Sequence, residues 1–92
     1  MKITYPIEWN ETDVFERPKK GWLNDVFVTM DSGEIFRLAF RDPLRLQQDF
    51  YDELKEGKIA LLERGLIVIP EVTKENIEKA IDQALKDGYF EK

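Results

Sequence analysis

The feature that most constrains the fold is the segment 22–42, where two runs of β-branched and aromatic residues flank Asp31-Ser32-Gly33. This pattern predicts a β-hairpin. A two-residue loop would pair Val28 with Arg37 and mix polar with apolar residues on each face. A three-residue loop with a left-handed glycine pairs Val28 with Phe36 instead, and we expect this register. It places on one face Val26, Val28, Met30, Phe36 and Leu38.

The residues before the hairpin give weaker signals. Residues 3–9 alternate between apolar and other side chains, but Pro6 lacks an N–H and confines this segment to an edge strand or an extended arm. Residues 10–21 contain Asn10, Pro18 and Gly21 and few apolar side chains. This composition predicts a loop.

Two helices are predicted after the hairpin. Asp42 followed by Pro43 marks a helix start, and this helix should run to about Glu56 and end at a left-handed Gly57. Its apolar stripe predicts packing on the hairpin and consists of Leu46, Phe50 and Leu54, with Leu44 and Tyr51 beside it. Thr73 should cap the last helix. The stripe that this helix should bury consists of Ile77, Ala80, Ile81, Ala84 and Leu85.

The segment 58–70 is best interpreted as two short strands around Glu63-Arg64-Gly65, with a helical turn at 59–62 as the alternative. The predicted order is β-ββ-α-ββ-α. We therefore expect one α+β domain over residues 1–92: a mostly antiparallel sheet of four to five strands with two helices packed on one face.

Composition excludes several functions. The chain has no cysteine and no histidine, which removes thiol nucleophiles, thiolate or imidazole metal ligands and Ser-His pairs. A formal charge of -5 disfavours nucleic-acid binding. No apolar stretch reaches the roughly 18 residues of a membrane span, and the N-terminus lacks the apolar core of a signal peptide, so we expect a cytoplasmic protein.

An acidic stripe lies along the helix predicted from residue 43. Its members recur at spacings of three, four and seven, which puts on one side Asp49, Asp52, Glu53 and Glu56. A solvated helix face is the favoured interpretation, ahead of a contact for a basic partner. A site for Mg²⁺ or Ca²⁺ ranks last, because hard cations usually draw oxygen ligands from loops or facing elements. We predict no bound metal and no cofactor.

The one basic stretch leads into the hairpin. Arg17, Lys19 and Lys20 precede Trp22, whose ring offers a stacking surface for a base. Three positive charges beside Asp13 and Glu16 make a weak footprint for phosphate. A solvated loop is therefore the favoured interpretation.

The second face of the hairpin mixes apolar and charged residues. Phe27 and Ile35 lie there among Arg37 and Arg41, a combination typical of an interface with an apolar centre and charged edges. The alternative, equally weighted, is that the N-terminal segment covers this face within the chain.

We therefore expect a non-catalytic protein-interaction module, with self-association as a homodimer or inhibition of a basic protein as specific forms. The rival hypotheses are an enzyme that uses carboxylates and a divalent metal, with Glu34 or Glu71 completing the site, and a phosphate or nucleic-acid binder through residues 17–22.

Overall fold

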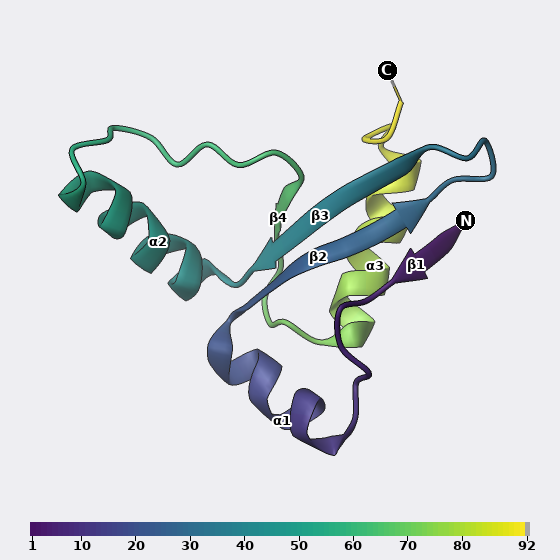
Figure 1. The fold of residues 1–92 in the computed structure, drawn as a ribbon, viewed down its shortest axis with the longest axis horizontal. Helices are drawn as coiled ribbons and strands as arrows, with labels where there is room; N and C mark the ends of the chain where they lie inside the picture. The colour runs from purple at the N-terminus through teal and green to yellow at the C-terminus, as the bar shows by residue number, and fades with distance from the viewer. Residues whose placement is uncertain (92) are drawn as a thin grey trace.

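The structure, a computed structural model, describes residues 1–91 and has one four-stranded sheet and three helices (Figure 1). The elements are β1 (Lys2–Thr4), α1 (Glu11–Lys20), β2 (Trp22–Thr29), β3 (Ile35–Arg41), α2 (Pro43–Lys55), β4 (Leu66–Val68) and α3 (Lys74–Lys86). The strands lie in the order β1-β2-β3-β4; the first two pairs are antiparallel and β3–β4 is parallel. The α+β class is confirmed.

The hairpin of β2 and β3 has the predicted register. Val26 pairs with Leu38 and Val28 with Phe36. The loop closes where the Met30 N–H donates to the Glu34 carbonyl at 2.8 Å, and Gly33 has a φ of 94°. The left-handed glycine that the three-residue loop requires is therefore present.

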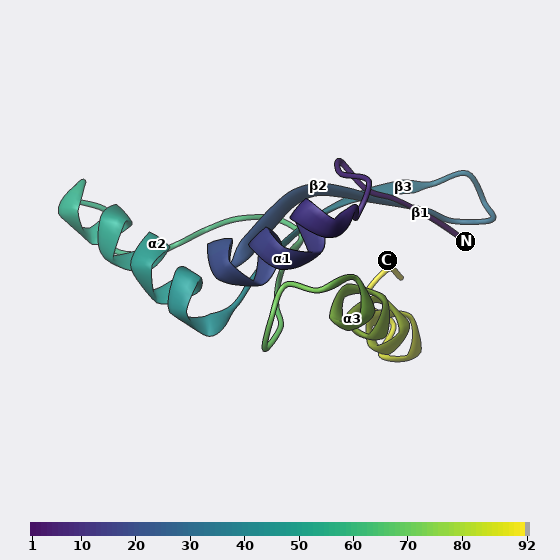
Figure 2. The same ribbon diagram turned by 90° about the horizontal axis from the view of Figure 1, so that it is seen from below.

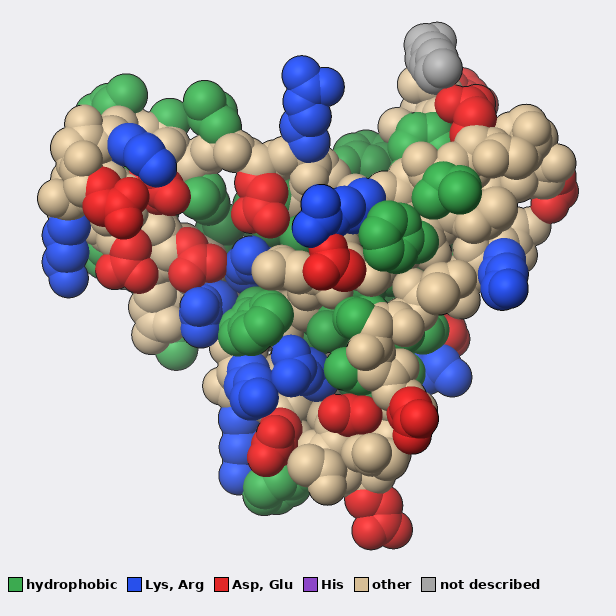
Figure 3. Space-filling model, in the orientation of Figure 1, with side chains coloured by type: hydrophobic (Ala, Val, Ile, Leu, Met, Phe, Trp, Pro, Cys, Tyr) green, Lys and Arg blue, Asp and Glu red, His purple; other side chains and the backbone are tan. Residues whose placement is uncertain are grey.

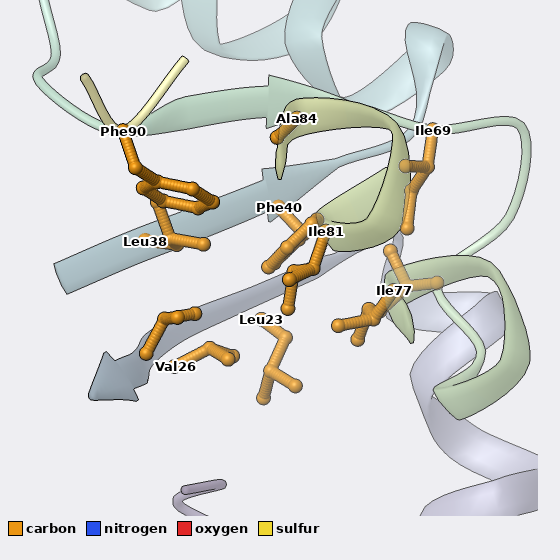
Figure 4. Packing of buried hydrophobic residues seen from close by; sticks show 11 residues of the cluster. Leu23, Val26, Leu38, Phe40, Ile69, Ile77, Ile81, Ala84 and Phe90 are labelled. Carbon is orange, nitrogen blue, oxygen red and sulfur yellow. The ribbon is translucent and has the colours of Figure 1, made fainter. Parts of the chain in front are cut away.

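The core lies between the sheet and α3, which covers one sheet face (Figure 2). Side chains from α3 point toward those of β2 and β3 (Figure 4). As predicted, the Thr73 hydroxyl caps α3 by accepting from the Asn76 N–H at 3.1 Å. The buried cluster consists of Leu23, Val26, Val28, Leu38, Phe40, Ile69, Val72, Ile77, Ile81, Ala84 and Phe90.

The N-terminal segment closes one edge of this core. β1 is an edge strand on β2, as predicted, and Pro6 follows it. The Tyr5 hydroxyl donates to Glu78 of α3 at 3.0 Å, and the Tyr5 and Trp9 rings meet edge to face at 5.6 Å. Because Tyr5 and its neighbours pack on the α3 side, the alternative in which they cover the second face of the hairpin is wrong.

The prediction of a loop at 10–21 is also wrong, because α1 fills most of this segment. Asn10 caps the helix by accepting from the Asp13 N–H at 2.9 Å, and Gly21 ends it with a φ of 73°. Asparagine and glycine are helix caps as well as loop residues. Pro18 lies in the last turn of the helix, and its missing N–H costs α1 one backbone hydrogen bond.

Helix α2 begins and ends where the sequence predicts, but it does not pack on the hairpin as predicted. The Asp42 carboxylate accepts from the Arg45 N–H at 2.7 Å, and Gly57 has a φ of 86°. However, no residue of α2 is buried, and the helix projects away from the sheet on the side opposite α3 and the hairpin tip (Figure 1). The prediction that both helices pack on one face is wrong, since only α3 does so.

The segment 58–65 is a loop, so neither the predicted first strand nor the helical turn at 59–62 is present. Only Leu66–Val68 forms a strand there. Residues 59–62 run alongside α2, away from the sheet (Figure 1), so no neighbouring strand is there to pair with them. The observed order is β-α-ββ-α-β-α, in which residues 42–65 form the long crossover that two parallel strands require.

Candidate interaction surface

We call residues 43–65, which comprise α2 and the loop after it, the arm. Its apolar side chains are unusually exposed. Ile59 is 86% exposed and Leu62 is 90% exposed. The other exposed large apolar residues of the arm are Leu44, Phe50, Tyr51 and Leu54. In Figure 3 the arm stands apart from the body, with hydrophobic side chains along the loop and acidic ones over α2.

A hollow of about 610 Å³, the arm hollow, lies between the arm and β4. One wall is the face of α2 that carries Leu46 and Phe50, and another is the strand β4. Its full lining consists of Pro43, Leu46, Gln47, Phe50, Ile59, Ala60, Leu61, Leu66 and Val68. Gln47 is the one polar side chain among these nine, so the hollow suits an apolar occupant.

A polar clamp holds the base of the arm. Arg41, at the end of β3, is 8% exposed and donates from Nε to Asp49 of α2 at 2.9 Å. It also donates from Nη1 to Asn24 of β2 at 2.7 Å and lies 3.6 Å from Glu63 of the arm loop. Arg45 donates to the second oxygen of Asp49 at 2.9 Å. The clamp orients α2 through charged hydrogen bonds and leaves its apolar face uncovered.

The acidic stripe of α2 is largely engaged within the chain. Asp49 belongs to the clamp, while Lys58 lies 3.0 Å from Glu53 and 3.5 Å from Glu56. The hydrogen bond to Glu53, with a smaller contribution from Glu56, raises the pKa of the Lys58 ammonium. Asp52 is exposed.

The rival metal site lacks its ligand cluster. Within residues 1–91, no group of three or more Asp or Glu side chains is arranged to hold a metal ion. Glu34 lies beside the hairpin loop and Glu71 lies between β4 and α3, and neither belongs to such a group.

The basic residues of segment 17–22 contact their own neighbours. The Arg17 guanidinium lies 5.1 Å from the centre of the Trp22 ring, and that of Arg45 lies 5.9 Å from it. Lys19 lies over the Phe15 ring at 3.6 Å, and Lys20 lies 3.6 Å from Glu16. Trp22 therefore already stacks with cations of the chain, in place of the nucleic-acid base that the sequence allowed.

The four residues singled out on the second face of the hairpin have different environments. Ile35 is 64% exposed and Phe27 is half-buried. Arg37 donates to Asp25 at 2.6 Å on the surface, whereas Arg41 is buried in the clamp. Asp25 has a φ of 61° at a break in the β2–β3 register. Phe27, Ile35 and Arg37 thus lie at this face, with Arg37 paired to Asp25, whereas Arg41 supports the arm.

A second hollow, of about 480 Å³, runs along β4 on its α3 side, and we call it the edge hollow. Five consecutive residues, 66–70, line one wall, and α3 forms the other. This wall consists of the α3 side chains Asn76, Lys79, Ala80, Gln83 and Ala84, followed by Asp87 and Tyr89 just after the helix. The strand β4 therefore has a hollow on each side.

Sequence reasoning missed the exposed residues Ile59 and Leu62 and the role of Arg41. A cluster of apolar residues in an acidic segment predicts burial, and nothing in the local pattern shows that Ile59 and Leu62 are exposed in the fold. The clamp joins residues 24, 41, 49 and 63, which are far apart in the sequence. Only the tertiary structure brings them together.

Comparison of the chain with protein-family models, with curated proteins and with solved structures finds no match. None of the helices in residues 1–91 has the combined length and apolarity needed to cross a membrane.

Proposed function

We propose that the protein is a non-catalytic protein-interaction module that binds its partner through the apolar face of the arm. The observation that carries this proposal is an amphipathic 13-residue helix, α2, with no buried residue. Isolated helices of this length are marginal in water, and most helices in proteins are stabilised by packing of their apolar face. A partner packed against the arm would supply that missing burial.

The clamp supports the same function. Arg41 and Asp49 fix α2 against the sheet by hydrogen bonds, so the apolar face is presented in one orientation before binding. A rigid surface loses less conformational entropy on association than a flexible one. Phe50 and Leu54 would form the dry centre, because binding energy concentrates in a few desolvated groups.

Inhibition of a basic protein through the acidic stripe has less support. Asp49, Glu53 and Glu56 already have cationic partners in the chain, which leaves Asp52 as the member whose charge is most available. These carboxylates fit the rim of the contact better than its centre. The absence of cysteine is compatible with the cytoplasmic location that we also propose.

The experiment compares two charge substitutions on α2. Phe50→Asp puts a carboxylate into the arm hollow, whereas Gln48→Asp adds the same charge on the exposed side of the helix. Affinity capture from native cell extract, with quantitative mass spectrometry, should show at least a tenfold loss of bound protein for Phe50→Asp and none for Gln48→Asp. Equal capture by both variants and the wild type would exclude the arm as the contact surface.

A further inference from the structure

We infer that the partner of the arm region is a second copy of this chain, and that the two copies pair their β4 strands antiparallel about a twofold axis at Ile67. This inference rests on the proposed function, because it names the occupant of the same surface. It follows from the hydrogen-bonding groups of β4, from the two hollows and from the sequence of the strand.

The outer edge of β4 has no strand beside it within residues 1–91. The Gly65 carbonyl accepts from the Ala39 N–H at 2.9 Å, and the Ile69 N–H donates to the Arg41 carbonyl at 3.0 Å. In a parallel pair, alternate residues direct their N–H and C=O toward the neighbour. Those of Leu66 and Val68 therefore point away from β3, toward the open edge of the sheet.

The two hollows define what kind of strand fits this edge. An added strand would place successive side chains on opposite faces, alternately into the arm hollow and the edge hollow. Leu66 and Val68 belong to the wall of the arm hollow, whereas Ile67 and Ile69 pack toward the core on the α3 side. The face of the occupant toward the arm hollow must therefore be apolar, and its other face meets the apolar residues of β4 and the polar side chains of the α3 wall.

β4 itself meets that requirement, since residues 66–69 read Leu-Ile-Val-Ile. A twofold axis at Ile67 would pair Leu66 of each copy with Val68 of the other. Both residues have outward N–H and C=O groups, so each such pair exchanges two hydrogen bonds. The contact is isologous and closes at two chains. The paired edges would join the two sheets into one.

The two edges of the sheet differ in the way this proposal requires. Edge strands are commonly protected from pairing by lysine or proline. Each edge strand has a proline two residues after its end, Pro6 after β1 and Pro70 after β4, but β1 contains Lys2 whereas Leu66–Val68 contains no charged residue and no proline. Within residues 1–91, the β4 edge therefore combines a strand free of charged residues with an apolar hollow on one face and a hollow of mixed polarity on the other.

The first experiment measures the mass of the purified chain by sedimentation equilibrium from 1 to 200 µM. We expect a dimer. Val68→Pro removes the outward N–H while leaving the bonds to β3 in place, and should weaken the dimer at least tenfold. Val68→Thr keeps the N–H and the β-branched shape, and should remain dimeric. Thermal melts confirm that each variant is folded. A monomeric wild type, or a dimer unaffected by Val68→Pro, overturns the inference.

The second experiment does not depend on the proline variant folding. The chain has no cysteine, so one introduced thiol per chain reports one position. In the proposed register the two Ile67 residues face each other as a non-hydrogen-bonded pair, with a separation that suits a disulfide. Ile67→Cys should form a covalent dimer on mild oxidation with diamide. Ile35→Cys, more exposed but far from β4, should not. Equal cross-linking of both variants contradicts the register.

Failure of this inference can be told apart from failure of the proposed function. A monomeric wild type whose capture of another protein is lost in Phe50→Asp rejects the second copy and retains the arm as a contact surface. The opposite result is a dimer that dissociates in Val68→Pro but not in Phe50→Asp, with the same captured proteins in Phe50→Asp as in the wild type. That result supports strand pairing and rejects the arm as a contact surface.

Discussion

Gly21 and Asp42 lie in direct contact, which joins the end of α1 to the start of α2. The Asp42 N–H donates to the Gly21 carbonyl at 2.9 Å. A Cβ on residue 21 would lie only 2.6 Å from Oδ2 of the Asp42 carboxylate. The same carboxylate caps α2. One side-chain atom at position 21 would therefore disturb two helix ends.

Gly21→Ala should lower the free energy of unfolding by about 2–3 kcal/mol. Left-handed strain at a φ of 73° accounts for about 1–2 kcal/mol, and displacement of the Asp42 cap for about 1 kcal/mol more. Gly33→Ala is the control, because its φ is also positive but its Cβ would meet no atom within 4 Å. Urea denaturation measures both variants, and equal losses would show that the contact with Asp42 is unimportant.

Arg41→Ala should destabilise the protein by about 2–3 kcal/mol, because it breaks part-buried hydrogen bonds to Asn24 and to the charged Asp49 and leaves that carboxylate without its partner on β3. Arg37→Ala removes a surface pair with Asp25 and should cost less than about 1 kcal/mol. Denaturant melts give the comparison. The clamp would lose its structural role if the two losses were similar.

Phe50→Ala should change the free energy of unfolding by less than about 1 kcal/mol while reducing association at least tenfold. Sequence alone predicts a core anchor at this position, but the ring is 36% exposed on a helix with no buried residue. Phe40→Ala, at a fully buried ring, should cost about 3–5 kcal/mol. Melting and sedimentation on the two variants test both effects. A large loss of stability in Phe50→Ala would place the ring in the core.

Tyr5→Phe should reduce the loss of stability above pH 10. Burial, and then the hydrogen bond and the charge of Glu78, raise the pKa of the Tyr5 hydroxyl well above its ordinary value of 10.0. A group whose pKa is raised by folding contributes stability below its unfolded pKa and loses it at higher pH. Urea melts between pH 8 and 11 should show a smaller alkaline decrease in the variant. Parallel curves would mean that Tyr5 ionises equally in both states.

Ile35→Glu tests the hairpin face as a contact surface. With Ile35 64% exposed, the substitution should leave the thermal midpoint nearly unchanged. If the contact is centred on the arm, association should fall less than threefold. Dissociation of a folded Ile35→Glu variant would instead move the centre of the interface to the hairpin face, where Phe27 and Ile35 lie.

The parts of the fold that follow from local sequence were predictable. The hairpin register depends on Gly33 and on alternation in β2 and β3, and the caps of α2 and α3 depend on Asp42 and Thr73. These signals act within a few residues. The segment 11–20 was misjudged because the same residues, Asn10 and Gly21, cap helices and form loops.

The position of α2 was not predictable from its sequence. An amphipathic stripe shows that a helix has an apolar face but not which surface covers it. Leu46, Phe50 and Leu54 would look the same whether they packed on the hairpin or on another chain. The clamp decides between these two positions, because it joins Arg41 to partners from three other segments, Asn24, Asp49 and Glu63.

The separation of the arm from the core has a consequence for how this sequence can diverge. Residues 42–65 connect two parallel strands, yet no side chain of α2 is buried in the core. Lengthening such a connection costs mainly loop-closure entropy, about 0.6 kcal/mol for each doubling. Insertions and substitutions beyond the clamp therefore change what the arm recognises at little cost to folding. Selection for a new partner and selection for a stable fold act on different residues of the chain.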